Sequence, residues 1–141
     1  MAESAKTFSL EKCTIFFGTP LKGGFGSDEA IKITPSGDTW SSEDGVDGTT
    51  AWAYTGSTKF KVEISLLQTS SMNAVLSALY YVQRETGIAV PLAYKDQNGL
   101  DLFASPAAII MKLPEMGRGN KIANQKWEIE AANGKLFLGG N

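Results

Sequence analysis

The 141 residues are about one domain's worth of chain, enough to bury about two-thirds of the surface that the unfolded chain exposes. Apolar residues make up 43% and charged residues 20%, which is typical of a globular protein and argues against a disordered chain. The chain has thirteen Lys and Arg residues and fifteen Asp and Glu residues. It therefore lacks the basic excess of a general nucleic-acid-binding protein, and this class is excluded. We expect a single domain over residues 1–141.

Two missing residue types exclude several classes of chemistry. The chain has no histidine, which excludes Ser-His-Asp and Cys-His catalysis and His-ligated zinc. Cys13 is the only cysteine, so neither an intrachain disulfide nor a Cys-rich metal site can form. No run of about 20 apolar residues and no signal-peptide pattern is present. We therefore expect an intracellular, non-enzymatic protein with no cofactor and no membrane association.

The first half of the chain has three strand patterns. Residues 13–17 are β-branched and aromatic and end at Gly18, and residues 30–34 alternate between apolar and polar side chains. Residues 59–67 alternate most clearly, with Phe60, Val62, Ile64 and Leu66 on one face. This alternation predicts a sheet with one face in the core and the other in water.

A long polar segment separates these strands. Residues 36–50 predict a long loop between strands, and such loops are usually functional or form an interaction arm. Residues 51–55 are expected to form a strand again. Trp40, Trp52 and Tyr54 lie in or beside this segment, either as anchors for a partner or as part of a loop that folds back over its own domain.

One helix is predicted over residues 70–86. Thr69, Ser70 or Ser71 can supply the N-cap, and Gly87 stands where a left-handed residue ends a helix. The apolar residues of this segment recur at helical spacing and predict one buried stripe. The stripe consists of Met72, Val75, Leu76, Leu79 and Val82, widened by Tyr80 and Tyr81. We expect the helix to lie along a sheet edge or to cover an open end of a sandwich.

The remainder of the chain again favours strands. Residues 88–94 and 100–104 flank an Asn98-Gly99 hairpin signal, and residues 107–113 are almost all apolar, as in a strand that is buried on both faces. Residues 125–131 and 135–138 are predicted to pair across a turn at Asn133-Gly134. The sequence thus predicts a mainly β fold, an antiparallel sandwich or rolled barrel of seven to nine strands with one flanking helix.

Possible ligand sites are better explained by ordinary structure. The glycines of residues 18–24 have the spacing of a phosphate loop, but Gly24 stands where the lysine should be. The acidic residues 43–48 lack the alternating carboxylates of a calcium loop. Glu128 and Glu130 alternate with apolar residues, as on a solvated sheet face, and Cys13 opens an apolar strand. We expect no catalytic residue and no metal site.

The order of the segments provides a further indication. It runs from Cys13–Gly23 and Ile31–Pro35 through a loop that ends Gly45-Val46-Asp47-Gly48. A Lys61–Ile64 strand then leads into Leu67–Leu76, followed by Pro91-Leu92 and Lys95–Gly99. Over roughly Phe8 to Glu130 this order resembles the tail tube proteins of contractile-tailed bacteriophages, most specifically in the Leu-Leu-Gln-Thr-Ser passage from strand to helix.

The resemblance implies a structural virion protein. Its subunits would form hexameric rings that stack into the inner tube of a contractile tail, through which DNA passes without specific binding. The implied partners are further copies of the chain and the sheath, baseplate and tail terminator proteins. The protein would be assembled in the cytoplasm of the bacterial host and would reside in the tail of the virion.

Two groups of residues are candidates for roles in such an assembly. The resemblance implies that the long loop reaches the neighbouring ring, which makes its acidic and aromatic residues candidates for ring stacking: Asp38, Trp40, Glu43, Asp44, Asp47 and Trp52. A channel for DNA should avoid a basic excess, and the polar faces of two strands mix both signs. Our hypothesis is that part of this face lines the channel: Lys59, Lys61, Glu63, Lys126, Glu128 and Glu130.

Two alternatives remain open at this point. One is a tube subunit of a contractile particle derived from a phage tail, which the sequence barely separates from a phage protein. The other is a monomeric β-barrel that binds a small ligand in its interior. It would need a closed apolar pocket and would leave the long loop unexplained.

Overall fold

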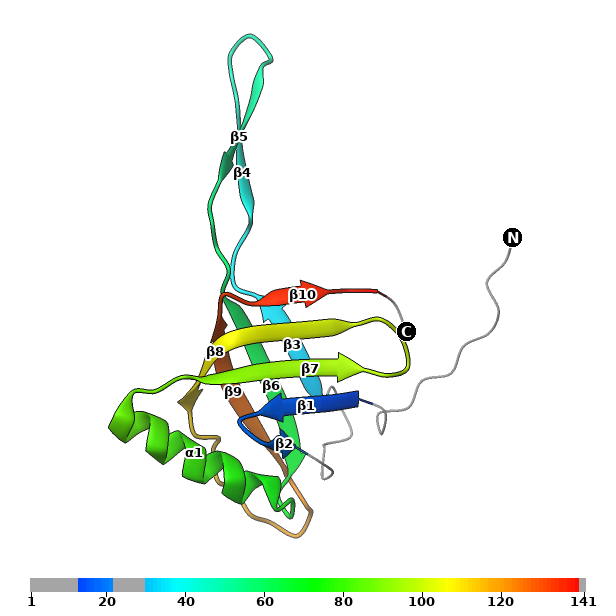
Figure 1. The fold of residues 1–141 in the computed structure, drawn as a ribbon, viewed down its shortest axis with the longest axis vertical. Helices are drawn as coiled ribbons and strands as arrows, with labels where there is room; N and C mark the ends of the chain where they lie inside the picture. The colour runs from blue at the N-terminus through cyan, green and yellow to red at the C-terminus, as the bar shows by residue number, and fades with distance from the viewer. Residues whose placement is uncertain (1–12, 22–29, 140–141) are drawn as a thin grey trace, which may run out of the picture.

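In the computed structural model, residues 13–21 and 30–139 are described, and they contain ten strands and one helix (Figure 1). The glycines at 23, 24 and 26 lie outside these ranges. The elements follow in chain order: β1 (Cys13–Phe17), β2 (Pro20–Leu21), β3 (Ile31–Pro35), β4 (Trp40–Asp44), β5 (Thr50–Tyr54), β6 (Phe60–Leu67), α1 (Met72–Thr86), β7 (Val90–Asp96), β8 (Leu102–Lys112), β9 (Asn124–Ala132) and β10 (Lys135–Phe137).

A rolled antiparallel sheet forms the body of the described chain. Its strands follow the order β2-β1-β7-β8-β9-β6-β3, and β10 also pairs with β8. In Figure 1, β10, β8, β7 and β1 lie in one layer, and β9, β6 and β3 cross behind them. The predicted mainly β, rolled antiparallel architecture is confirmed.

Strand β8 belongs to both layers. Residues 102–105 pair with β7, whereas residues 107–112 pair with β9. Between them, Leu92 is opposite Ser105 and Val90 is opposite Ala108, so β8 has one extra residue at this point. Such a bulge bends a strand and accommodates Pro106, which has no N–H for the ladder. The prediction of two separate strands, 100–104 and 107–113, is therefore wrong.

The predicted hairpin at Asn133-Gly134 is also wrong. β10 pairs with β8 and not with β9, and β9 and β10 run in the same direction along one side of β8. Asn133 has a φ of 52°, and a Cβ on Gly134 would lie 2.6 Å from Phe60 Cδ1. The Asn-Gly pair therefore forms a kink at which the chain crosses from one layer to the other. The expected hairpin at Asn98-Gly99, by contrast, does connect β7 and β8.

The core lies between the two layers. The inward-facing side chains alternate with polar ones along β6 and β9, as expected for strands with one buried face. Phe60 and Phe103, from opposite layers, pack edge to face with ring centroids 5.2 Å apart. The largest fully buried side chains include Trp127, Phe17, Phe103, Ile15, Leu21, Ile64, Leu66 and Leu76.

The C-terminal half of β8 is buried on one face only. Ala108 and Ile110 are buried, whereas Ile109 and Met111 are 39% and 55% exposed. The expectation that residues 107–113 would be buried on both faces is wrong, because nothing in the described part of the chain covers the outer side here. The outer face of the sheet therefore carries an exposed apolar row beside β9.

Helix α1 confirms the predicted segment and its C-cap. It ends at Gly87, which has a φ of 70° and donates its N–H to the carbonyl of Gln83. Leu76 is fully buried, and Met72, Leu79 and Tyr80 pack against the core. Val82, predicted in the buried stripe, is instead 54% exposed, and the neighbouring Gln83 takes the buried position.

Two polar side chains attach α1 to the sheet. Gln83 Nε2 donates to the carbonyl of Ala108 at 3.0 Å, and Gln83 Oε1 accepts from the N–H of Ile110 at 3.0 Å. This amide therefore replaces a strand along β8 where β7 has ended. At the other end of α1, Asn73 Oδ1 accepts from Trp127 Nε1 at 2.9 Å. The helix thus covers the lower side of the roll in Figure 1, as the sequence predicted.

Replacing Gln83 with Leu should lower the free energy of unfolding by roughly 2–4 kcal/mol, because the backbone groups of Ala108 and Ile110 would lose their partners in a buried place. Chemical denaturation would measure this change. The matched control is Arg84→Leu on the exposed side of the helix, which should change stability by less than about 0.5 kcal/mol. Equal stability of the two variants would contradict the assigned role of Gln83.

Candidate assembly surfaces

A β-hairpin replaces the long loop predicted over residues 36–50. Strands β4 and β5 pair in register, with Trp40 opposite Tyr54 and Asp44 opposite Thr50. This hairpin, residues 38–55, is called the arm below, and it extends away from the rolled sheet (Figure 1). The strand expected at 51–55 is confirmed. The alternative of a loop folded back over its own domain is wrong.

Two of the acidic side chains shape the arm. Asp47 Oδ1 accepts a hydrogen bond from the Thr49 N–H at 3.0 Å, and this bond holds the pKa of Asp47 below its usual range. Asp44 Oδ1 accepts from the Thr50 hydroxyl at 2.8 Å. In the described part of the chain, no group of three or more Asp, Glu or Cys side chains is placed to hold a metal ion.

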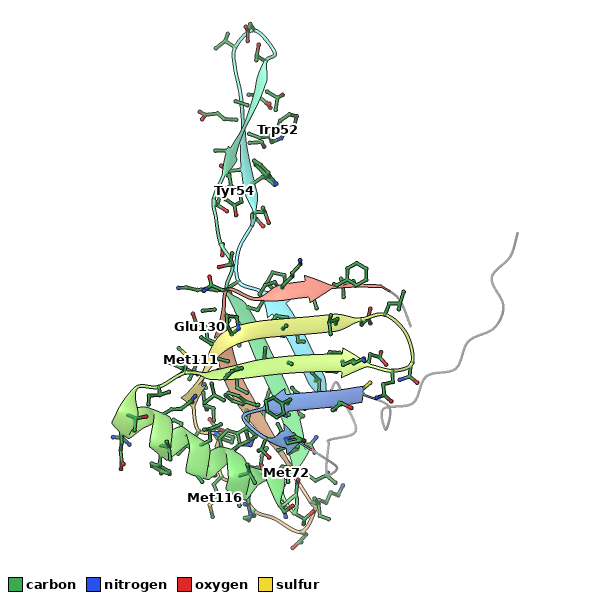
Figure 2. All side chains as sticks on the ribbon, viewed as in Figure 1. Trp52, Tyr54, Met72, Met111, Met116 and Glu130 are labelled. Carbon is green, nitrogen blue, oxygen red and sulfur yellow. The ribbon has the colours of Figure 1, made fainter. Side chains whose placement is uncertain are left out.

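One face of the arm is aromatic. Residues opposite each other in an antiparallel pair share a face, which places Trp40, Tyr54 and Trp52 on the same side. Their exposed fractions are 59%, 65% and 71%, and the rings of Trp40 and Tyr54 lie 5.4 Å apart. Figure 2 shows Trp52 and Tyr54 well away from the body of the protein. The arm thus exposes aromatic surface that the described body does not cover.

The arm is also strongly acidic. Asp38, Glu43, Asp44 and Asp47 all lie on it, and no Lys or Arg occurs between residues 36 and 58. The structure therefore brings all six predicted stacking residues together on one projecting hairpin. Their role in ring stacking stays a prediction.

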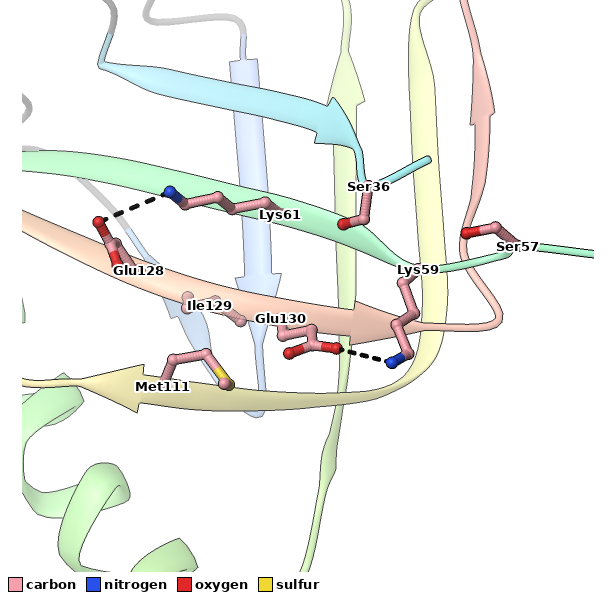
Figure 3. Close-up of a pocket in the computed structure, with 8 residues that line it drawn as sticks. All are labelled: Ser36, Ser57, Lys59, Lys61, Met111, Glu128, Ile129 and Glu130. Carbon is pink, nitrogen blue, oxygen red and sulfur yellow. Dashed lines mark ion pairs between the residues drawn. The ribbon is translucent and has the colours of Figure 1, made fainter. Parts of the chain in front are cut away.

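The six predicted channel residues lie together: five are on the outer face of β6 and β9, and Lys59 immediately precedes β6. Glu63 pairs with Lys126 at 2.8 Å and with Lys61 at 3.3 Å. Lys61 also pairs with Glu128 at 3.7 Å. Lys112 also pairs with Glu128 and extends this network of alternating charges. Lys59 and Glu130 form a separate ion pair beside it, and Figure 3 shows part of this arrangement. That this face lines a channel stays a prediction.

Glu63 is at the centre of this network. Its side chain is 13% exposed, against 60% for Lys126. The hydrogen bond from Lys126 and, more weakly, that from Lys61 hold the pKa of Glu63 below its usual range, against the opposing effect of burial. The carboxylate is therefore stabilised in its charged form.

An open cleft of about 560 Å³ lies next to the network. Its lining combines Lys59, Lys61 and Glu130 with the apolar side chains of Met111 and Ile129 (Figure 3). Met111 is not among the residues predicted for this face, because the apolar run 107–113 predicts a strand that is buried on both faces. A two-residue alternation within that apolar run would have separated Ile109 and Met111 from their buried neighbours.

The connection between β8 and β9 forms another exposed surface that the sequence analysis did not single out. Met116 and Ile122 are 82% and 62% exposed, and Leu113 is 37% exposed. A shallow pocket of about 270 Å³ opens here, lined by residues that include Leu113, Met116 and Arg118.

In the described residues, no helix is both long and apolar enough to span a bilayer.

A structural protein of a bacteriophage is similar to this chain. "Structural protein ORF10" of Pseudomonas phage KPP10 is 28% identical over 150 residues, covering 100% of this chain and 87% of that protein. The chain is a homologue of a phage structural protein. No family model matches the sequence.

Three solved structures share the fold. A chain from the cap that terminates the tube of the anti-feeding prophage gives a TM-score of 0.59 at 11% identity, covering 97% of this chain and 95% of that one. The sheath/tube terminator of the extracellular contractile injection system PVC gives 0.61 at 13%, covering 96% and 100%. A chain of the PVC sheath–tube complex gives 0.61 at 10%, covering 93% and 91%. The rolled sheet thus has a fold that also occurs in these three assemblies.

Replacing Glu63 with Gln should flatten the acid limb of the stability profile. The folded-state pKa of Glu63 is lowered, so its contribution to stability is present above its unfolded-state pKa and is lost as the pH falls through the folded-state value. Denaturation midpoints measured between about pH 6 and pH 3 should therefore fall less steeply in Glu63→Gln than in the wild type. The control is Glu85→Gln on the exposed end of α1, which should follow the wild-type profile. A Glu63→Gln profile that matches the wild type would contradict this assignment.

Proposed function

We propose that this chain is a structural subunit of a contractile tail that assembles into rings around a central channel, the rings stacking into the inner tube. The homology to a phage structural protein and the fold shared with tube, cap and terminator assemblies support this role. The proposed role is structural and involves no catalysis. The proposed partners are further copies of the chain and the sheath, baseplate and terminator proteins.

The observation that carries the proposal is the arm. A hairpin of two five-residue strands is marginally stable alone, and this one exposes two tryptophans and a tyrosine. Large aromatic side chains are the usual anchors of protein interfaces, and burying each contributes well over 1 kcal/mol. A subunit that assembles through the arm would cover this surface, whereas an isolated monomer would leave it in water.

The open edge of the sheet also supports assembly with further copies of the chain. Among the described residues, β3 pairs with β6 on one side and with no strand on the other. An open edge is a template for pairing with another chain, and joining edges around a closed ring removes it. In the proposed hexameric ring, the neighbouring subunit covers this edge.

The ionic face of β6 and β9 suits the wall of a channel. Its lysines and glutamates neutralise one another, so DNA would meet little net positive charge. A wall of this kind would let DNA pass without holding its phosphates. We therefore assign the six residues of this face to the channel of the proposed tube.

A tube terminator is the second candidate. Two of the similar structures are a terminating cap and a sheath/tube terminator, and both cover nearly the whole chain. A tube subunit stacks into long open-ended rods, whereas a terminator forms single rings that stop a stack. If the chain belongs to a contractile particle derived from a phage tail, the same two roles, tube subunit and terminator, apply there.

The interior argues against the monomeric ligand-binding barrel. The space between the layers is filled by large side chains, among them Trp127, Phe103 and Phe17, which are at most 2% exposed. The clefts found in the described chain open at its surface instead. A barrel that binds a ligand inside would need room that these side chains occupy.

Negative-stain electron microscopy and light scattering of the purified full chain test the proposal. We expect rings, and rods of uniform width at higher concentration, if the chain is a tube subunit. Single rings that never lengthen would identify a terminator instead. A 15.1 kDa monomer at every concentration would overturn both roles.

Replacing Trp40 and Trp52 together with Ser should leave a folded subunit but weaken ring stacking at least about tenfold, because the aromatic anchors are lost while the body is untouched. Circular dichroism would check the fold, and sedimentation the fraction of stacked rings. The matched control is Ile88→Ser, an exposed apolar residue beyond the end of α1. Normal rods from the double variant would remove the arm from the interface.

A further inference from the structure

The arm lies at one end of the rolled sheet, and the β8–β9 connection lies at the other. The arm joins β3 to β6. It enters β6 at Phe60, which pairs with Ala131 of β9, and the opposite end of the β6–β9 ladder is the Leu67–Asn124 pair. The β8–β9 connection leads directly into Asn124. Figure 2 shows the same separation, with Trp52 and Met116 at opposite ends of the molecule.

The charges of these two ends are opposite. The arm contains four acidic residues and no basic one, while outside it thirteen basic residues face eleven acidic ones, so the arm carries −4 and the rest of the chain +2. Residues 112–122, called the basic loop below, contain Lys112, Arg118 and Lys121 against Glu115. The basic loop alone therefore carries a charge of +2.

The apolar chemistry of the two ends also matches. The arm presents tryptophan and tyrosine rings, and the basic loop presents Met116, Ile122 and Leu113 beside a shallow pocket. Methionine packs well against aromatic rings, because its thioether is flexible and polarisable. The exposed cations of this loop can also lie over aromatic faces.

We propose that the arm of one copy of this chain docks on the basic loop of a second copy, its aromatic face covering Met116 and its carboxylates facing Arg118 and Lys121. This inference rests on the proposed function and specifies the contact by which its rings stack. The two surfaces are different and lie at opposite ends of the molecule, so the contact is head-to-tail and repeats without closing.

A charge-reversal experiment in the full chain tests this contact. The arm variant carries Asp38→Lys, Glu43→Lys and Val46→Lys, which changes the arm from −4 to +1 and keeps the Asp44 and Asp47 carboxylates that shape it. The loop variant carries Arg118→Glu and Lys121→Glu, which changes the basic loop from +2 to −2. Sedimentation and electron microscopy at low salt would measure the fraction of rings that are stacked.

Each variant alone should stack about tenfold less than the wild type, because like or absent charges would face each other at the contact. The two variants mixed, or combined in one chain, should recover stacking at low salt and lose it as salt rises. The matched controls are Lys95→Glu on β7 and Glu85→Lys on α1, both exposed and outside the proposed contact, and both should stack normally.

The outcomes separate this inference from the proposed function. If the wild type forms rods and the loop variant forms them equally well, the basic loop is not the docking site, although the tube role stands. If both variants lose stacking and the combination does not recover it, the two surfaces do not meet and the inference is overturned. If the wild type remains monomeric, the tube role fails and the docking contact fails with it.

Discussion

The structure depends on one constraint: β8 has to belong to both layers of the rolled sheet. The extra residue around Pro106 bends the strand, and the Ser105 hydroxyl holds the bend by donating to the carbonyl of Ala132 at 2.6 Å. On the facing strand, the chain turns the same corner at Gly134, where any side chain would meet Phe60 and Phe103. Once both strands are bent, their apolar faces enclose the core without a second sheet.

Bending β8 also creates an edge whose backbone groups need other hydrogen-bond partners. Within the C-terminal half of β8, β7 reaches only Ala108, through Val90, so further backbone hydrogen-bond partners are needed on that side. Gln83 supplies them from α1, and Asn73 fixes the other end of the helix to Trp127. The helix therefore seals one side of the roll by hydrogen bonding as much as by apolar contact. The arm and the outer edge of β3, which no other described element covers, are among the surfaces proposed for assembly.

Local periodicity was enough to predict β6 and α1. In both, the spacing of apolar residues matches the repeat of the element, and Gly87 marks the end of the helix. The six residues proposed for the channel were also predicted to share one face, because a strand with one buried face fixes the side of every other residue.

The failures have equally specific causes. Asn133-Gly134 favours positive φ, and a kink within one edge needs that conformation just as a hairpin does. Gln83 was missed because its partners are backbone groups 25 and 27 residues further along the chain, which no local pattern can show. The arm was predicted as a loop because its strands bury no face, and alternation without burial leaves no apolar period to detect.

The composition of the arm disfavours contacts other than the one proposed. An exposed hairpin with three aromatic rings is a hazard for aggregation, and nearby charge is a common protection against edge-to-edge association. Four carboxylates and no cation make the arms of different copies repel one another, so an arm-to-arm dimer is disfavoured. The same negative charge attracts the arm to the positively charged basic loop at the far end of another copy. In the proposed assembly, the acidic residues therefore supply direction and the aromatic residues supply most of the binding energy, which would favour an open stack over a closed pair.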